Sequence, residues 1–254
     1  MTLPSSGSLS LSSINTEFGL GTNLNAYRGH QWWYANNVSG YFSSGAITFN
    51  DFYSRGLSPV IAGSNNFTTP GTYTLTIPLY NTFTANVGGS GGGGGGSVVY
   101  VGSGDPKTGG GAGDIMGADG ASGTNSSFAS SNLCLAVAGG GGQREQVSYA
   151  YDGKTYTPTF TSGASGTNGT ASGPGTSTTG GGASGGAGGS YGGNTGGSGG
   201  AGGKEFKSWN FGDSGAPAPG SNITIIVGTG GAGGSSNLSS GSSGSNGYVM
   251  ISWT

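Results

Sequence analysis

A long glycine-rich stretch constrains this chain more than any other feature. It runs from Gly88 to about Gly234 and contains the unbroken run Gly91–Gly96. Each glycine held in regular structure costs roughly 0.5–1 kcal/mol of backbone entropy relative to alanine. Summed over the stretch, this cost exceeds the net stability of a typical domain, about 5–15 kcal/mol. The stretch is therefore either a disordered linker or a packed backbone whose hydrogen bonds require glycine.

The composition favours the ordered alternative. Only 31% of the 254 residues are hydrophobic and 6% are charged. Low apolar content alone indicates disorder, but disordered chains are usually highly charged and poor in aromatic residues. Because this chain contains 4 Trp, 12 Tyr and 10 Phe, we expect an ordered structure built from glycine.

Charge and apolar content exclude several classes of partner. The formal net charge is −2 and the Lys and Arg residues are scattered singly, so we expect no nucleic-acid partner. The sequence has neither a secretion signal nor a run of about 18 apolar residues, and we expect no membrane insertion. Cys134 lies in an apolar run, which predicts a buried thiol and synthesis in a reducing cytoplasm.

Residues 1–57 form a separate small module in which one pattern occurs twice. Each copy has an alternating apolar pair, a candidate helix N-cap and a glycine stop: Leu9/Leu11, Ser12 or Ser13, and Gly19 in the first, and Ile47/Phe49, Asn50 and Gly56 in the second. The pattern predicts a short strand that leads into about one helical turn. The repetition indicates a degenerate internal duplication.

A dense aromatic cluster lies between the two copies. Trp32, Trp33 and Tyr34 are consecutive, and such a cluster in a short module indicates either a compact core or a contact to another subunit. We treat these three residues as candidates for attachment or subunit contact. An aromatic platform for a ligand is the less favoured alternative.

The amino-acid sequence of this module resembles that of a known one. The segments beginning at Leu11, Asn23 and Gly45, namely LSSINTEFG, NLNAYRG and GAITFNDFY, resemble a module that recurs in tail-fibre and other virion-appendage proteins of tailed bacteriophages. The resemblance covers roughly residues 7–57. It implies a virion structural protein and leaves its position in the particle open.

Several segments after residue 65 alternate as strands do. Apolar residues occupy every second position in four of them: Tyr73/Leu75/Ile77, Phe83/Ala85/Val87, Leu133/Leu135/Val137 and Ile223/Ile225/Val227. Residues 98–101 also predict a strand. Pro78 ends the strand that contains Tyr73, Leu75 and Ile77, or places it at a sheet edge. The apolar residues from Tyr248 to Trp253 predict a terminal strand paired in a sheet.

This order of features is similar to the glycine-rich domain at the C-terminus of many phage tail fibres, and to the polyglycine-II bundles of phage adhesin tips. A backbone helix with three residues per turn makes no internal hydrogen bonds, so every amide and carbonyl needs a neighbouring segment or water. We therefore predict a mainly β fold: a strand-turn-helix module at 1–57, a linker at 58–65, and a glycine-rich β/polyglycine-II domain at 66–254.

Catalytic chemistry has little support in the sequence. His30 is the single histidine and Cys134 the single, buried-looking cysteine, so the sequence gives little support for a Ser/His/Asp or a Cys/His site, and we predict no catalytic, cofactor or metal-binding residues. A carboxylate pair for glycan hydrolysis would have to come from isolated loop residues. These are Asp105, Asp114, Asp119, Glu145, Asp152, Glu205 and Asp213.

Two insertions interrupt the glycines and concentrate charge and aromatic residues, at 143–160 and 204–213. Loops mounted on a rigid scaffold commonly carry recognition, and Tyr and Trp supply contact area at low entropic cost. The candidate receptor-binding residues are therefore Tyr149, Tyr151, Tyr156, Phe206, Trp209 and Phe211. The alternative is that these side chains pack onto the scaffold or between subunits.

Together the resemblances imply a bacteriophage tail-fibre or tail-tip structural protein, located in the virion tail and made in the cytoplasm of the bacterial host. We expect it to bind a host cell-surface glycan or outer-surface protein without catalysis. Partners would include other tail proteins and further copies of the chain, since such fibres are usually homotrimers. The alternatives are a purely structural collar, head or baseplate component and, less favoured, a polysaccharide depolymerase.

Overall fold

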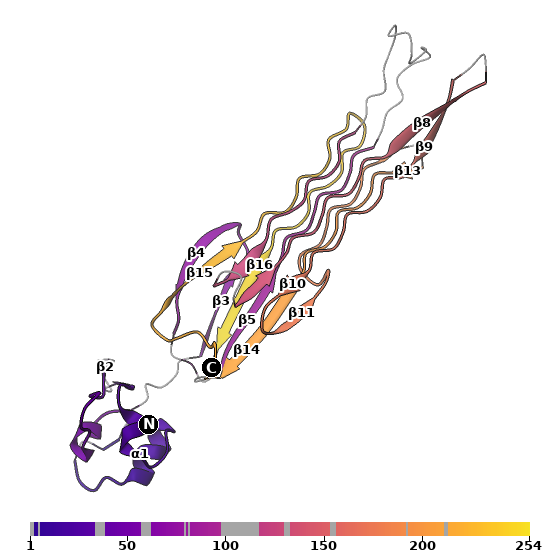
Figure 1. Cartoon of the computed structure of the whole chain (residues 1–254). Helices are drawn as coiled ribbons and strands as arrows, with labels where there is room; N and C mark the ends of the chain where they lie inside the picture. Colours follow the sequence, from indigo (N-terminus) through magenta and orange to yellow (C-terminus); the bar gives the residue numbers. More distant parts are fainter. Residues whose placement is uncertain are drawn as a thin grey trace. The chain divides into compact units, whose positions relative to one another are not determined.

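The computed structural model describes residues 3–4, 6–33, 39–56, 62–78, 80, 82–97, 117–129, 133–152, 156–191, 193–210 and 213–254 (Figure 1). The fold is mainly β, as predicted, and all its strand pairs are antiparallel. The chain divides into two compact units. The first comprises Met1–Ala62 with Leu79–Asn81 and Thr254, and the second comprises Gly63–Pro78 with Thr82–Trp253. The predicted linker at 58–65 extends too far, because strand β3 already begins at Gly63.

Helix α1 of the first unit spans Leu11–Phe18. Its N-cap is Ser10, whose side chain accepts a hydrogen bond from the Ser13 amide at 3.1 Å. The predicted caps Ser12 and Ser13 therefore lie inside the helix, and Leu11 begins the helix where a strand was predicted. Gly19 ends it, as predicted, in the left-handed region with a φ of 72°.

The second copy of the pattern forms a shorter helix. The 3₁₀ helix η2 spans Phe49–Phe52, and Thr48 caps it through a reciprocal bond with Asp51. The prediction of Asn50 as the cap is wrong, since Thr48 provides the cap two residues earlier. A further 3₁₀ helix, η1, spans Leu24–Tyr27, and the strands β1 (Gln31–Trp33) and β2 (Ser39–Tyr41) pair with each other.

The two copies meet in one aromatic core. Phe18 of α1 packs edge-on against Phe52 of η2, with ring centroids 5.9 Å apart. Both rings also contact Tyr27 and Phe42. Ile14 is fully buried beside them. This arrangement explains why each copy ends its helical turn on a phenylalanine.

The second unit contains two five-stranded sheets. The first sheet has the order β11-β14-β5-β16-β3 and the second has the order β10-β7-β6-β15-β4. The strands of the first sheet are β11 (Thr176–Thr178), β14 (Lys204–Asn210), β5 (Thr82–Gly88), β16 (Tyr248–Trp253) and β3 (Gly63–Phe67). Those of the second are β10 (Ala171–Ser172), β7 (Cys134–Ala136), β6 (Ser126–Phe128), β15 (Asn222–Val227) and β4 (Gly71–Thr76).

The apolar faces of the two sheets pack against each other as a sandwich. Phe83 of β5 stacks on Phe128 of β6 with ring centroids 5.7 Å apart. The predicted apolar faces of β4, β5 and β15 are the buried ones. In β7 the predicted alternation is present but its phase differs: Cys134 and Ala136 are buried, and Leu135 is half-buried on the opposite face.

Strands of both sheets continue into glycine-rich segments that run side by side away from the sandwich (Figure 1). We call these segments the glycine bundle. The central segment is 89–97. Three other segments run away from the sandwich beside it: 137–145, 181–189 and 228–236. Four segments run back toward the sandwich: 117–125, 162–170, 196–203 and 239–247.

The amides of the central segment donate to three neighbours in turn. Gly92, Gly93 and Gly94 donate to Gly200, Ala121 and Ser242, at 2.9, 2.8 and 2.9 Å, and the next three residues repeat the order one turn further on. The carbonyls follow the same period, because those of Gly92, Gly93 and Gly94 accept from Gly186, Gly142 and Gly234. The backbone amides and carbonyls of successive residues therefore point in three directions.

Within the described residues, six segments thus surround the central one, alternating in direction. Each is also hydrogen-bonded to the next, as in the bonds Ala121 to Ala232, Gly244 to Gly231 and Ser242 to Ala187. Segment 162–170 lies outside this ring, where it bonds to 137–145 and 196–203. The described part of the glycine stretch is accordingly an ordered scaffold rather than a linker.

Close backbone approach explains the glycine in the central segment. A Cβ atom placed on any of Gly91–Gly96 would lie less than 3.0 Å from backbone atoms of a neighbouring segment. Side chains instead occupy the outward positions, such as the exposed Ala187 and Ser242. Most positions where segments meet are thus glycine, although Ser90 and Ser97 of the central segment are also buried, and Ser, Thr, Asn or Ala occupy most positions that face water.

Candidate functional site

Three described chain connections lie at the end of the glycine bundle away from the sandwich (Figure 1). The first is the hairpin of β8 (Gln146–Tyr151) and β9 (Tyr156–Thr161). The second contains β12 (Ser190–Tyr191) and β13 (Asn194–Thr195), and the third is the turn around Leu238. We call this end the distal tip. Residues 98–116, with the predicted strand at 98–101, lie outside the described residues.

The β8/β9 hairpin is anchored at its base by two hydrogen bonds that backbone amides donate. The amide of Arg144 donates to the carboxylate of Asp119 at 2.8 Å, and that of Glu145 donates to the carbonyl of Gly96 at 3.1 Å. The Glu145 side chain is only 1% exposed, in the place that inward glycines occupy elsewhere in its segment. The insertion at 143–160 is thereby joined directly to the central segment.

Three candidate receptor-binding residues belong to this hairpin. Tyr151 is in register with Tyr156, and Tyr149 with Pro158. Because alternate positions of a ladder share a face, these four strand positions lie on the same side of the hairpin. The side chains of Tyr149, Tyr151 and Tyr156 lie outside the described part of the structure. The prediction that they contact a receptor stays a prediction.

The two short connections expose large side chains that the sequence analysis missed. Tyr191 is 55% exposed and Leu238 is 49% exposed. The Leu238 turn is held by hydrogen bonds, from the Ser236 amide to the Ser240 hydroxyl at 3.0 Å and from the Leu238 amide to the Ser236 hydroxyl at 3.3 Å. The sequence signal that could have identified Leu238 is its position as a single large apolar residue within a run of Ser, Asn and Gly.

The two connections are also tied to each other. The amide of Ser190 donates to the hydroxyl of Ser239 at 3.1 Å, which places the residues before Tyr191 beside the Leu238 turn. Rigid exposed apolar side chains bind at a lower entropic cost than mobile ones. The distal tip therefore presents Tyr191 and Leu238 on a preorganised backbone.

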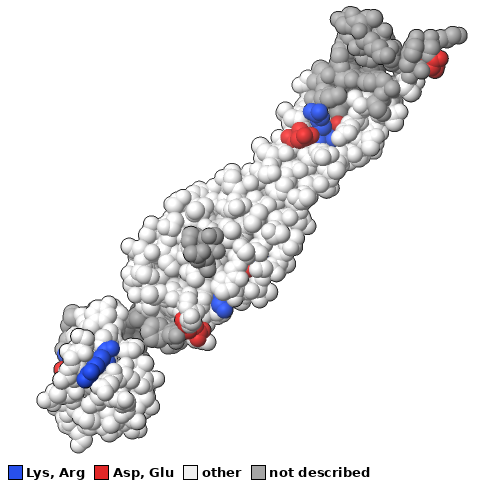
Figure 2. Space-filling model, viewed as in Figure 1, with Lys and Arg blue, Asp and Glu red and all other residues white. Residues whose placement is uncertain are grey.

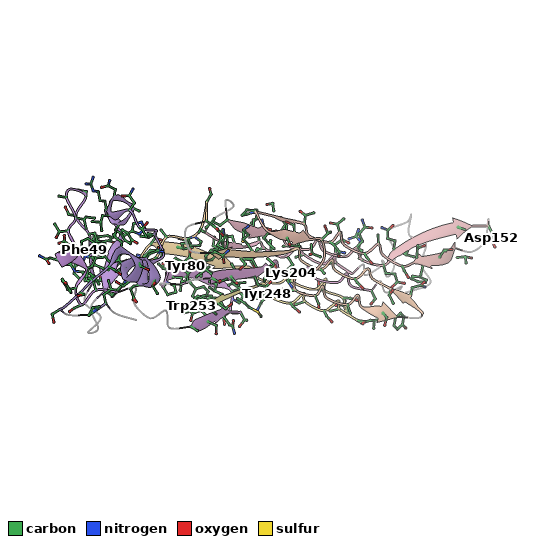
Figure 3. All side chains as sticks on the ribbon, turned by 90° about the horizontal axis from the view of Figure 1, so that it is seen from below. Phe49, Tyr80, Asp152, Lys204, Tyr248 and Trp253 are labelled. Carbon is green, nitrogen blue, oxygen red and sulfur yellow. The ribbon has the colours of Figure 1, made fainter. Side chains whose placement is uncertain are left out.

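Charged side chains lie at the two ends of the second unit and not along the bundle on the face shown in Figure 2. Arg144, Asp119 and Glu145 cluster where the hairpin begins, and Asp152 lies at the end of β8 (Figure 3). The middle of the bundle carries neutral side chains such as Ser242 and Ala187. The bundle is thus a neutral spacer, and side-chain chemistry is gathered at its ends.

Phe206 and Trp209, from the insertion at 204–213, do not lie at the distal tip. They belong to β14, which pairs with β5 inside the first sheet. Trp209 points into the sandwich, is 2% exposed and contacts Phe83 and Phe128. Its prediction as a receptor-binding residue is corrected, because a buried indole cannot contact a partner. Phe206 is 43% exposed on the outer face of the sheet, and Phe211 lies outside the described residues.

In the first unit, Trp32 and Trp33 lie on β1 and are half-buried, while Tyr34 lies outside the described residues. Trp32 packs on the edge of the aromatic core, and the Arg55 guanidinium lies 4.0 Å from the centroid of its ring. The more exposed aromatic side chain of this unit is Tyr41, at 70%. The role of Trp32 and Trp33 in attachment stays a prediction.

The described carboxylates have structural partners. Glu205 is fully buried, where it accepts from the Gly175 amide at 2.8 Å and from the Ser177 hydroxyl. Asp213 accepts from the Asn210 amide at 2.8 Å. Asp105 and Asp114 lie outside the described residues. No group of His, Cys, Asp and Glu side chains able to hold a metal ion occurs in the part of the chain that the structure describes.

Cys134 is buried in the sandwich, as predicted. Burial, and to a smaller extent the negative charge of Glu205, raise the pKa of its thiol to about 12, while the positive charge of Lys207 opposes the shift. The thiol is therefore protonated and unreactive at neutral pH. Among the described residues, none of the helices has the length and apolar character needed to cross a membrane.

Comparison with known proteins identifies no relative: no family model, curated protein or solved structure matches this chain.

Proposed function

We propose that this protein is a structural component of a bacteriophage tail fibre or tail tip, and that its distal tip binds the host surface without catalysis. The observation that carries the proposal is the placement of the three described connections at one end of a neutral, backbone-bonded bundle. Recognition loops commonly lie on rigid scaffolds. The resemblance of residues 7–57 to virion-appendage modules supports the assignment to a phage particle.

We further propose that the glycine bundle is a polyglycine-II assembly. In a helix with three residues per turn, successive amides point about 120° apart and no bond forms within the segment. The threefold rotation of the bonds made by Gly92, Gly93 and Gly94 supports this geometry. Such an assembly would hold the distal tip at a fixed distance from the sandwich.

In this proposal the first unit attaches the protein to the preceding tail component. Its aromatic core and capped helices support an independently folded module. The resemblance also implies a virion location. The homotrimer that it implies and the twofold strand pair proposed below exclude each other, and the mass of the full chain distinguishes them. A purely structural appendage remains the second candidate, in which Tyr191 and Leu238 would be assembly contacts.

Adsorption measurements test the recognition step. The purified chain is expected to bind host cells and to block adsorption of the phage, and a Tyr191→Ser/Leu238→Ser variant is expected to lose at least about tenfold in both assays. That loss corresponds to about 1.4 kcal/mol, typical of removing one good apolar contact. The matched control is Ile226→Ser/Met250→Ser, which removes apolar side chains of similar exposure (41% and 40%) from the sandwich.

Equal losses in the two variants would show that the distal tip is not the binding surface. Failure of the purified chain to bind cells or to block adsorption would favour the purely structural role. Gold-labelled antibodies against the chain, viewed on intact particles by electron microscopy, would then locate it at the tail, collar, head or baseplate.

A further inference from the structure

Each sheet of the described sandwich has a long strand at one edge, β3 in the first sheet and β4 in the second, and β4 is the longer of the two. Strand β4 is the last strand of its sheet and pairs with β15 on one side. On the other side of its sheet, the edge strand β10 has two residues, whereas β4 has six. Short edge strands resist pairing with other chains, whereas long uncharged ones favour it. Within the described residues, the outward backbone groups of β4 make no hydrogen bond.

The bond pattern identifies which groups face this edge. The amide of Ile77 donates to the carbonyl of Ser221 at 2.9 Å, on the β15 side. In an antiparallel ladder the bonded residues alternate, so Tyr73 and Leu75 also bond toward β15. The amides and carbonyls of the threonines between them therefore point outward: Thr72, Thr74 and Thr76. The side chains of these three threonines are exposed on the outer face of the sheet.

The sequence of this edge is symmetric about Thr74. Thr72 and Thr76 lie two residues on either side of it, and Pro70 and Pro78 lie four residues on either side. If two such strands pair antiparallel about a twofold axis at Thr74, every outward amide and carbonyl of the three threonines finds a partner. The prolines fall opposite each other at both ends. Because proline has no amide hydrogen, pairing stops there.

We propose that β4 pairs with β4 of a second copy of this chain. The strand carries no charge that would oppose its own approach, and threonine faces threonine at all three register positions, a favourable cross-strand pair. An identical patch on both partners is what a twofold interface requires. The flanking prolines limit the contact to a discrete dimer rather than an extended sheet. This inference does not depend on host recognition.

Mass measurement of the full chain tests the pairing. Light scattering after size exclusion is expected to give the mass of two copies for the unchanged protein, and of one copy for Thr74→Lys, because two lysines would then face each other at the axis. Thr224→Lys is the control, since Thr224 is the exposed partner of Thr74 on the neighbouring strand, one position away from the edge. This variant is expected to stay dimeric.

A single-copy mass for the unchanged chain would overturn the proposal, as would a three-copy mass, because a twofold strand pair cannot close a trimer. Loss of the dimer in Thr224→Lys would also overturn it, since the effect would not be specific to the edge.

Cysteine cross-linking tests the register without disturbing the edge. Residues of a hydrogen-bonded antiparallel pair have Cα atoms about 5.5 Å apart, within the range that a disulfide bridges. Oxidised Thr74→Cys is expected to give covalent dimers. Thr72→Cys is not, because its position faces Thr76 of the second copy. Cys134 is buried and its thiol is protonated, so the parent chain gives the background level of cross-linking. Equal cross-linking at both positions, or at neither, would contradict the proposed register.

Discussion

The amide of Gly94 donates a hydrogen bond to the carbonyl of Ser242 at 2.9 Å, in the middle of the glycine bundle. The two residues belong to neighbouring antiparallel segments. Since neither segment forms bonds within itself, the stability of both depends on such lateral bonds. This dependence makes the bundle sensitive to any atom placed between its segments.

Gly94→Ala is expected to destabilise the second unit by about 3 kcal/mol or more, at the upper end of what overpacking costs. The added Cβ would lie less than 3.0 Å from the backbone of Ala187. Ala187→Ser is the matched control, because it adds one atom to an exposed side chain of that same neighbouring segment. Thermal unfolding measures both. If Gly94→Ala unfolds at the temperature of the parent chain, the packed bundle is refuted.

The loss of stability caused by an insertion into segment 239–247 is expected to depend on whether the number of inserted residues is a multiple of three. Gly-Ser-Ser placed between Ser243 and Gly244 keeps every glycine in phase and displaces the distal turn by about 9 Å, the rise of one three-residue turn. A single Ser at the same site rotates the following contacts by about 120°. Denaturant unfolding is expected to show a loss below about 1 kcal/mol for the first and several-fold more for the second. Equal losses would argue against a threefold backbone helix.

Substitution by alanine is expected to cost much more stability at Trp209 than at Phe206, although both residues lie on the same strand. Trp209→Ala removes a buried side chain, and such changes cost about 3–5 kcal/mol. Phe206→Ala removes a side chain that is 43% exposed, and a loss of about 1 kcal/mol or less is expected. Chemical denaturation measures the difference. A large loss for Phe206→Ala with a small one for Trp209→Ala would mean that β14 faces the opposite way.

The Cys134 thiol is expected to make stability fall at alkaline pH. Its pKa is raised from the ordinary 9.0 to about 12 in the folded protein, so the folded state holds the proton more tightly than the unfolded state. The stabilisation is therefore complete below pH 9 and declines as the pH rises toward 12. Denaturant midpoints across this range measure it, with Cys134→Ala as the control. An unchanged pH dependence in that variant would assign the decline to other groups.

Local sequence patterns predicted much of this fold because strand alternation and glycine spacing depend on near neighbours. The alternation around Leu75, Ala85 and Ile225 predicted both the strands and their buried faces. The cap of α1 was misplaced, since Ser10, Ser12 and Ser13 are chemically equivalent candidates and only the backbone geometry selects among them.

The candidate site was less predictable. Aromatic content pointed to both insertions, and the structure brings only the hairpin of 143–160 to the distal tip. Trp209 was selected because its neighbours are charged, and its burial depends on which face of β14 meets the second sheet. Tyr191 and Leu238 are single large residues within runs of small residues, which is a weak signal, and their significance comes from where the bundle ends.

The sequence by itself favoured an ordered glycine stretch over a linker, because of its aromatic residues and alternating segments, and indicated that segments without Cβ atoms can approach closely. Only the tertiary structure decided which segments surround 89–97 and which end of the bundle gathers the connections. The physical reason is that glycine segments carry no side chains to distinguish one neighbour from another. Their order is therefore set by the strands that continue from them, whose pairing in the two sheets depends on contacts far apart in the sequence.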